Sequence, residues 1–182
     1  MLHFEFDNLD HIINEVTFDN MKLKALLGFL KCPVFEKKLY AINKLSELKE
    51  HKIMTIRNSH RRQMLVESNI TEILFGAQYH EEIVRRCPKF LVFLSPSLTS
   101  QTLSEILINS FQHSNEKSSS VCECFSELIK NVNYDTLLSI FEACTEIPYS
   151  KINMKLIALI KNILSRSIIV NNNEQVDSKI II

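Results

Sequence analysis

Glycine and proline are scarce in this sequence. Its 182 residues include only two glycines and four prolines, whereas the two types together make up roughly 12% of an average protein. Sandwiches, barrels and phosphate-binding loops need such residues at their tight turns. Their shortage therefore argues against those folds and against a glycine-rich nucleotide site, and it favours long helices joined by short connections.

The sequence also lacks net charge and long apolar runs. Lys and Arg number 21, as do Asp and Glu, so no overall field attracts nucleic acid or an anionic membrane. Apolar runs such as residues 90–94 are far shorter than the ~20 residues of a membrane span. The N-terminus carries acids where a signal peptide has basic and apolar residues. We therefore expect a soluble cytoplasmic protein, with the nucleus as the alternative location, and neither a membrane nor a nucleic-acid partner.

The cysteines do not form a recognisable site. They are odd in number, and most fall on apolar stripes: Cys32, Cys87, Cys122, Cys124 and Cys144. This pattern predicts small buried side chains in a reducing compartment. Cys122 and Cys124 are spaced too closely for a zinc knuckle or a C-x-x-C redox pair. No loop that could form an oxyanion hole accompanies Cys87 or Cys144, so we expect no catalytic thiol.

A single histidine begins a metal-like motif. The run from His80 to Val84, HEEIV, starts like a zinc-protease helix, but Val84 stands where the second histidine would be. His80 is therefore predicted to lie on the surface at the start of a helix. We expect no metal and no cofactor in this chain.

Apolar residues recur at the helical spacing of three and four along most of the chain. One predicted helix carries leucines at 23, 26, 27 and 30, and the next, after Pro33, carries apolar residues at 35, 39, 42 and 45. Further stripes predict helices over residues 80–94, 99–111, 121–132, 137–144 and 150–164. The last of these is apolar around most of its circumference, so it is expected to lie between neighbours.

Several helix boundaries can be predicted from single residues. The run NITE at 69–72 has the form of a capping box, opening a short helix that Gly76 would end in the left-handed conformation. Pro88 predicts either a kinked helix or two helices, with Pro88 in the first turn of the second. Thr99 is a predicted N-cap. Residues 113–120 are predicted to form a loop, since their serines offer nothing to bury.

These elements predict an all-α protein. Helix pairs recur at roughly 35–40 residues, the range of HEAT and armadillo repeats, and such pairs bury their apolar faces by stacking on the next pair. We therefore expect an armadillo/HEAT-like stack of short antiparallel helices, with a compact bundle of about nine helices as the alternative. The expected organisation is an acidic first helix over 1–20, a repeat domain over 21–168 and a flexible tail over 169–182.

Some segments resemble a known family. They are LKCPVFEKKLYAIN at 30–43, ILFG at 73–76, HEEIVRR at 80–86, FLVFL at 90–94, LT at 98–99, LSEIL at 103–107 and LLSIF at 137–141. In this order and approximate spacing, over residues 21–145, they resemble the large ubiquitin-specific proteases of the fat-facets type. The resemblance implies an armadillo/HEAT-like platform that precedes the catalytic domain of such a deubiquitinase.

The resemblance does not extend to the catalytic residues. The Gly-Asn-Thr-Cys-Tyr type cysteine box of that family is absent from these residues, as are its histidine box and zinc-ribbon cysteines. We therefore expect a non-catalytic scaffold for protein–protein interaction, with ubiquitin-pathway substrates among its candidate partners. Two alternatives remain: a fragment of an active ubiquitin-specific cysteine protease, and a nucleic-acid binder that uses basic helix faces.

Two arginine pairs are the candidate partner-binding residues. Arg61 and Arg62 form one pair, and Arg85 and Arg86 form the other. On helices, both pairs are expected to lie on solvated faces, where they would contact an acidic partner.

Overall fold

The computed structural model describes residues 2–48, 55–76, 78–112 and 115–177. Within these ranges the protein is all-α, as predicted, with ten α-helices, two short 3-10 helices and no strands. The helices are α1 (Leu2–Lys31), α2 (Phe35–Ser46), α3 (Thr55–Glu67), α4 (Ile70–Phe75), α5 (Glu81–Val84), α6 (Pro88–Leu94), η1 (Ser95–Ser97), α7 (Ser100–Ser110), α8 (Asn115–Leu128), α9 (Tyr134–Thr145), η2 (Tyr149–Lys151) and α10 (Met154–Asp177). None of these helices is long and apolar enough to cross a bilayer.

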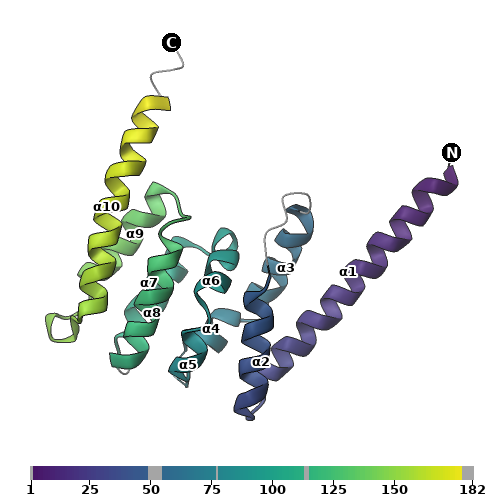
Figure 1. Cartoon of the computed structure of the whole chain (residues 1–182), viewed down its shortest axis with the longest axis horizontal. Helices are drawn as coiled ribbons and strands as arrows, with labels where there is room; N and C mark the ends of the chain where they lie inside the picture. The colour runs from purple at the N-terminus through teal and green to yellow at the C-terminus, as the bar shows by residue number, and fades with distance from the viewer. Residues whose placement is uncertain (1, 49–54, 77, 113–114, 178–182) are drawn as a thin grey trace.

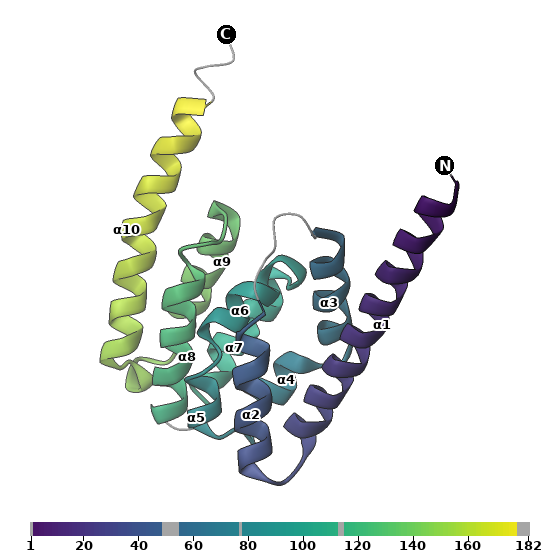
Figure 2. The ribbon, with the colours of Figure 1, turned by 45° about the vertical axis from the view of Figure 1, so that its right-hand side comes forward.

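The helices are stacked in the order of the chain. α2 packs against α1, α5 and α6, α8 packs against α5, α6, α7 and α10, and α9 packs against α7 and α10. Both ribbon views place α1 at one end of the array and α10 at the other (Figures 1 and 2). Each helix therefore buries its apolar side on nearby helices of the sequence, as in a stacked array.

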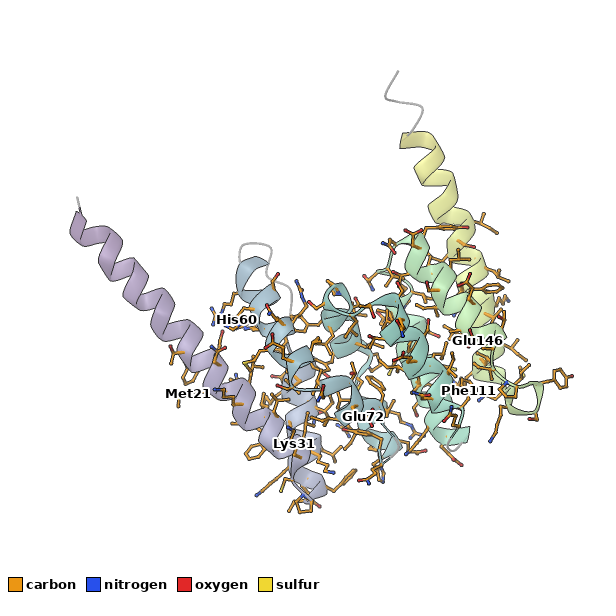
Figure 3. All side chains as sticks on the ribbon, turned by 180° about the vertical axis from the view of Figure 1, so that it is seen from behind. Met21, Lys31, His60, Glu72, Phe111 and Glu146 are labelled. Atoms are coloured by element: carbon orange, nitrogen blue, oxygen red, sulfur yellow. The ribbon has the colours of Figure 1, made fainter. Side chains whose placement is uncertain are left out.

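The core follows the predicted apolar stripes. The side chains of neighbouring helices meet between the ribbons (Figure 3), and Phe90 of α6 and Phe125 of α8 are the largest that are fully buried. Other buried residues of the predicted stripes are Leu23, Leu26, Leu27, Leu30, Ile42, Leu45, Ile83, Cys87, Leu91, Leu94, Leu103, Ile106, Leu107, Phe111, Leu128, Leu137, Ile140 and Leu156. The helical spacing in the sequence thus identified the buried face of most helices.

Pro88 divides its segment into two helices. α5 ends at Val84, and α6 begins with Pro88 in its first turn. The turn between them is closed by backbone bonds from Arg86 N to Ile83 O at 3.0 Å and from Cys87 N to Val84 O at 2.9 Å. Of the two alternatives, the structure has the division, because proline has no N–H and fits the first turn of a helix.

Two predicted caps have different outcomes. Thr99 is the N-cap of α7, and its Oγ1 accepts a bond from Thr102 N at 3.1 Å, as predicted. The capping box at Asn69 is wrong, since its side chain makes no cap bond and its backbone is left-handed, with φ 56°. Asn69 stands between the end of α3 and the start of α4, where the chain must turn sharply, and asparagine tolerates that conformation.

The left-handed stop predicted at Gly76 is also wrong, because its φ is −67°. Gly76 does end α4, with its N–H bonded to Glu72 O at 2.9 Å. A Cβ at this position would lie 2.5 Å from the same carbonyl oxygen. Close backbone approach, rather than a positive φ, therefore explains the glycine.

The loop predicted over 113–120 is wrong from Asn115 onward, where α8 begins; residues 113 and 114 lie outside the described ranges. Ser118 and Ser120 are buried. Asn153 Nδ2 donates to Ser118 Oγ at 3.1 Å, so this serine meets the approach to α10. Small side chains such as serine allow helices to pack closely. The prediction of a loop relied on the absence of large apolar residues and therefore did not recognise this buried helical turn.

The predicted domain boundaries both fall inside helices. α1 runs without a break from Leu2 to Lys31, across the boundary at 20. α10 runs from Met154 to Asp177, across the boundary at 168. The expected tail over 169–182 is therefore helical up to Asp177, because adding a residue to an established helix is easier than starting one. Residues 178–182 lie outside the described ranges.

Core truncation tests this packing. Phe90→Ala and Leu128→Ala should each lower the free energy of unfolding by on the order of 3 kcal/mol, since both side chains are fully buried. Leu138→Ala is the matched control, because Leu138 is exposed, and it should change stability by less than about 1 kcal/mol. Urea unfolding monitored by circular dichroism measures all three, and values near zero at both core positions would contradict the fold.

Candidate functional site

The four candidate arginines do not share one face. Arg61 and Arg62 lie on α3, which packs against α1, α4, α6 and η1, whereas Arg85 and Arg86 follow α5, which packs against α2, α4 and α8. Arg62 is only 8% exposed, with its guanidinium 5.6 Å from the centre of the Phe93 ring. The prediction of a solvated position is therefore wrong for Arg62, which forms a cation–π contact inside the array.

Arg61 belongs to an ion cluster between α1 and α3. Its Nη2 contacts Asp19 Oδ2, and Arg57 Nε donates to the same oxygen at 2.5 Å. Burial alone would raise the pKa of Asp19, but the hydrogen bonds and positive charges of Arg61 and Arg57 outweigh it and hold the pKa below its ordinary value of 3.8. Arg61 therefore joins two helices, through an acid 42 residues earlier in the chain.

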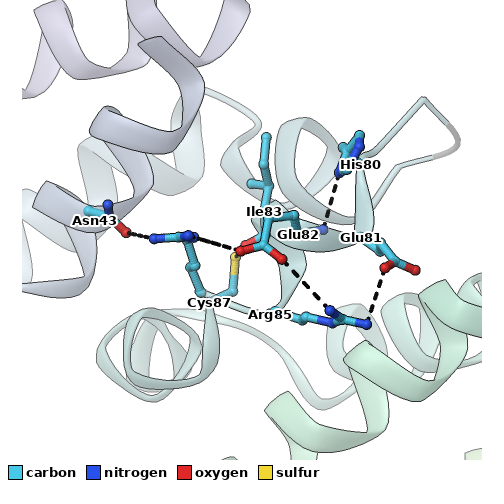
Figure 4. A network of polar contacts seen from close by, with 8 residues as sticks. Asn43, His80, Glu81, Glu82, Ile83, Arg85 and Cys87 are labelled. Carbon is cyan, nitrogen blue, oxygen red and sulfur yellow. Dashed lines mark hydrogen bonds and ion pairs between the residues drawn. The ribbon is translucent and has the colours of Figure 1, made fainter. Parts of the chain in front are cut away.

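Arg85 and Arg86 have different surroundings (Figure 4). Arg85, whose side chain is 52% exposed, pairs with Glu81 at 3.1 Å and with Glu82 at 3.7 Å. Arg86 pairs with Glu82 at 2.9 Å and donates to Asn43 Oδ1 on α2 at 3.0 Å. Arg86 therefore links α5 to α2, and Arg85 is the candidate that remains most accessible to a partner.

His80 lies at the start of α5, as predicted. Its Nδ1 accepts a bond from Glu82 N at 3.3 Å, and its ring centre lies 4.6 Å from that of Phe35. Within the part of the chain that the structure describes, no three His, Cys, Asp or Glu side chains are grouped so that they could hold a metal ion. The contacts of His80 are those of a helix cap.

Four of the five cysteines are buried, as the apolar stripes predict, and all five are free thiols. Burial raises the pKa of Cys122 and of Cys144 to about 12, and it raises the pKa of Cys87 and of Cys124 well above the ordinary range. Cys87 and Cys124 donate their S–H groups to the backbone oxygens of Ile83 and Val84, both at 3.2 Å. These four thiols are therefore protonated core side chains and poor nucleophiles.

Apolar side chains are exposed at the far end of the array. On α10, Met154, Ile157, Leu164 and Ile168 follow one side of the helix, and Met154 is 77% exposed. We call these four residues the α10 stripe. α10 was predicted to lie between neighbours, and this is wrong over the residues whose burial the structure describes, because α10 packs on α8 and α9 while the four residues of the stripe are exposed. The spacing identified an apolar helix, but whether a further helix covers it depends on its place in the stack.

The α10 stripe adjoins a groove. Tyr134, Leu137, Leu138 and Phe141 of α9 line this groove together with Ile163, Leu164 and Ser167 of α10, and it encloses about 160 Å³. Its wall is mainly apolar. A helix lying along the stripe could place a side chain in this groove. Sequence spacing alone could not predict the groove, because it forms only where α9 and α10 lie side by side.

The first helix also has an exposed apolar side. Phe18 is 68% exposed, Met21 and Phe29 are exposed too, and Figure 3 shows Met21 facing away from the other helices. A Cβ at Gly28 would meet no atom within 4 Å, so the backbone is accessible there. Both end helices of the array therefore present apolar surface, which neither the composition nor the charge pattern indicated.

Comparison with known proteins yields no relative. No family model matches the chain, and no curated protein or solved structure matches it. The resemblance to the fat-facets-type proteases therefore stays a prediction that rests on the segments quoted from the sequence.

The Asp19 cluster can be tested by pH. Asp19→Asn should lower the free energy of unfolding at neutral pH by about 2 kcal/mol, as expected for hydrogen bonds to a charged group. Because the folded-state pKa is depressed, this contribution is present above the unfolded-state pKa and is lost as the pH falls through the folded-state pKa. The unfolding free energies of the two proteins should therefore begin to converge below about pH 4 and meet at pH values below the folded-state pKa.

The matched control for Asp19→Asn is Glu47→Gln, which also removes one carboxylate from an ion pair. Glu47 pairs with Lys44 at 2.9 Å on the surface, and exposed pairs contribute little to stability. A difference between wild type and Asp19→Asn that stays constant with pH would contradict the assigned pKa direction.

Thiol labelling tests the burial of the cysteines. In the folded protein, half-buried Cys32 should react with Ellman's reagent first, and the four buried thiols should react only as fast as the array opens. The absorbance change in native buffer and in urea counts the reactive groups. Rapid labelling of Cys87 or Cys144 in native buffer, identified by mass spectrometry, would contradict the structure.

Proposed function

We propose that this chain is a non-catalytic helical-repeat scaffold that binds proteins through the end helices of its array. The observation that carries the proposal is the exposed apolar surface on α10, with its adjoining groove. Contiguous apolar patches on soluble proteins mark interaction sites, and stacked helices present long surfaces to partners.

The absence of catalysis in this proposal is supported by the four buried thiols. A cysteine nucleophile acts as the thiolate, and burial keeps these four protonated at neutral pH. The link to a deubiquitinase and to ubiquitin-pathway partners is supported by the sequence resemblance. The free cysteines are consistent with a reducing compartment, the cytoplasm or the nucleus.

Photo-crosslinking tests the scaffold. A photoreactive amino acid placed at Met154 or Met21, both exposed and apolar, should crosslink to a protein in cell extract. The same group at Asn162, which is exposed on a polar side of α10, is the matched control and should give far less product. Mass spectrometry identifies the crosslinked protein, and the absence of any crosslink from positions 154 and 21 would contradict the proposal.

A ubiquitin substrate tests the proposed lack of activity. The purified chain should release no fluorophore from a fluorogenic ubiquitin derivative, because four of its five thiols are buried and the cysteine and histidine boxes of the resembled proteases are absent from these residues. Turnover that iodoacetamide abolishes would contradict the proposal and favour the cysteine-protease alternative.

A further inference from the structure

We propose that a cleft along α4 binds an extended peptide segment that carries one acidic and one basic residue. The cleft is separate from the end helices of the proposed function, so it adds a second binding surface to the scaffold. The proposal follows from two adjoining hollows, from the opposite charges at their two ends, and from the absence of partners for those charges among the described residues.

The two hollows meet at α4. The first encloses about 320 Å³ between α4 and α7, and the second encloses about 460 Å³ where α1 and α2 approach α4. Glu72 and Gly76 line both hollows, so the two form one depression, which we call the α4 cleft. Gly76 has no side chain that could divide it.

One end of the α4 cleft is basic. Lys31 at the end of α1 and Lys38 of α2 line it, and neither ammonium group forms an ion pair or a hydrogen bond with a described residue. Tyr79 lines the same end, and burial raises the pKa of its hydroxyl well above the ordinary value of 10.0. The hydroxyl therefore stays protonated. Ammonium groups and a hydroxyl are donors for a carboxylate, so an acidic side chain fits this end.

The other end of the α4 cleft is acidic. Glu72 of α4 and Glu105 of α7 line it, and its lining includes no Lys or Arg. Glu105 accepts a hydrogen bond from Gln101 Nε2 at 2.9 Å, which leaves its charge uncompensated because glutamine is neutral. An arginine side chain, with five N–H donors, could bond to both carboxylates. The amides of Asn109 and Gln112 line the same end and can bond to a peptide backbone.

This separation of charge selects the class of ligand. A polyanion such as RNA would be attracted by Lys31 and Lys38 but repelled by the carboxylates of Glu72 and Glu105, and a polycation would meet the opposite repulsion. A ligand with one charge of each sign is attracted at both ends. The α4 cleft therefore favours a bipolar peptide over nucleic acid or an anionic membrane.

The width of the array sets the spacing of the two charges. α4 packs against α1 and against α7, and the axes of packed helices lie about 8–10 Å apart. The path from α1 across α4 to α7 is therefore up to about 16–20 Å, which an extended chain covers in about five or six residues at ~3.3 Å each. We therefore place the acidic and basic residues of the peptide about five positions apart.

NMR titration of the ¹⁵N-labelled full chain tests this site. The probe is the peptide Glu-Ala-Ser-Ala-Ser-Arg with blocked ends, and the matched control peptide has Gln in place of Glu and Arg. The probe should shift amide signals of residues that line the α4 cleft, Gly76 among them, and leave those of α10 unchanged. It should bind at least about threefold more tightly than the control peptide, as expected for exposed ion pairs, and higher salt should weaken it.

Variants of the chain test each end of the cleft. Lys38→Gln and Glu105→Gln should each weaken binding of the probe about threefold, since each removes one ion pair. The double variant Lys31→Glu with Lys38→Glu should instead prefer the peptide in which Arg replaces Glu, an exchange that a purely structural role would not produce. Lys151→Gln and Glu146→Gln are the matched controls, because both residues are exposed outside the cleft; Figure 3 labels Glu146 far from Glu72. Both controls should bind as wild type does, and thermal melts should be unchanged in all variants.

Several results would overturn the inference. They are the absence of shifts at millimolar probe, equal binding of the probe and the neutral peptide, and unchanged affinity in both glutamine variants. Inorganic phosphate or oligouridylate that shifts the same signals at lower concentration than the probe would also overturn it, in favour of an anion or RNA site. Crosslinking from positions 154 and 21 does not involve the cleft, so failure of the peptide titration leaves the proposed function standing, and failure of the crosslinking leaves the cleft.

Discussion

The protein depends on the burial of one apolar stripe per helix against the next helix. The helices between α1 and α10 are short, and isolated helices of such length are only marginally stable in water. Stacking removes their apolar sides from water, with Phe90 and Phe125 fully buried near the middle. α8 has a central part in this, because it contacts α5, α6, α7 and α10. Polar contacts such as Arg86 with Asn43 then fix how neighbouring helices are aligned.

The sequence predicted most of the helices and most buried faces, because spacing is a local property that a single chain displays. It did not predict features that depend on a neighbour. Ser118 is buried since a partner from the approach to α10 meets it, and Asn69 is left-handed since two helices meet there. The exposed side of α10 depends on its position at the end of the stack. Each of these requires knowledge of which helices touch.

The candidate site shows the same limit more strongly. Arg61, Arg62, Arg85 and Arg86 were grouped by residue type, but their surroundings are set by residues far along the chain. Asp19 neutralises Arg61, and the Phe93 ring covers Arg62. The basic residues that the sequence indicated as a partner surface thus serve largely to join helices. The exposed surface on α10 is apolar, and it became visible only when the packed side of that helix was known.

The ordered stacking also has a mechanical consequence. In a stacked array, each helix is held only by the helices next to it, so a helix with packed neighbours on both sides is held most firmly. α10 packs on α8 and α9, and the α10 stripe stays exposed, so local opening of this helix should need less free energy than opening of the helices in the middle of the array. A protein bound to an end helix would act as an added repeat, and it would raise the free energy needed to open that helix.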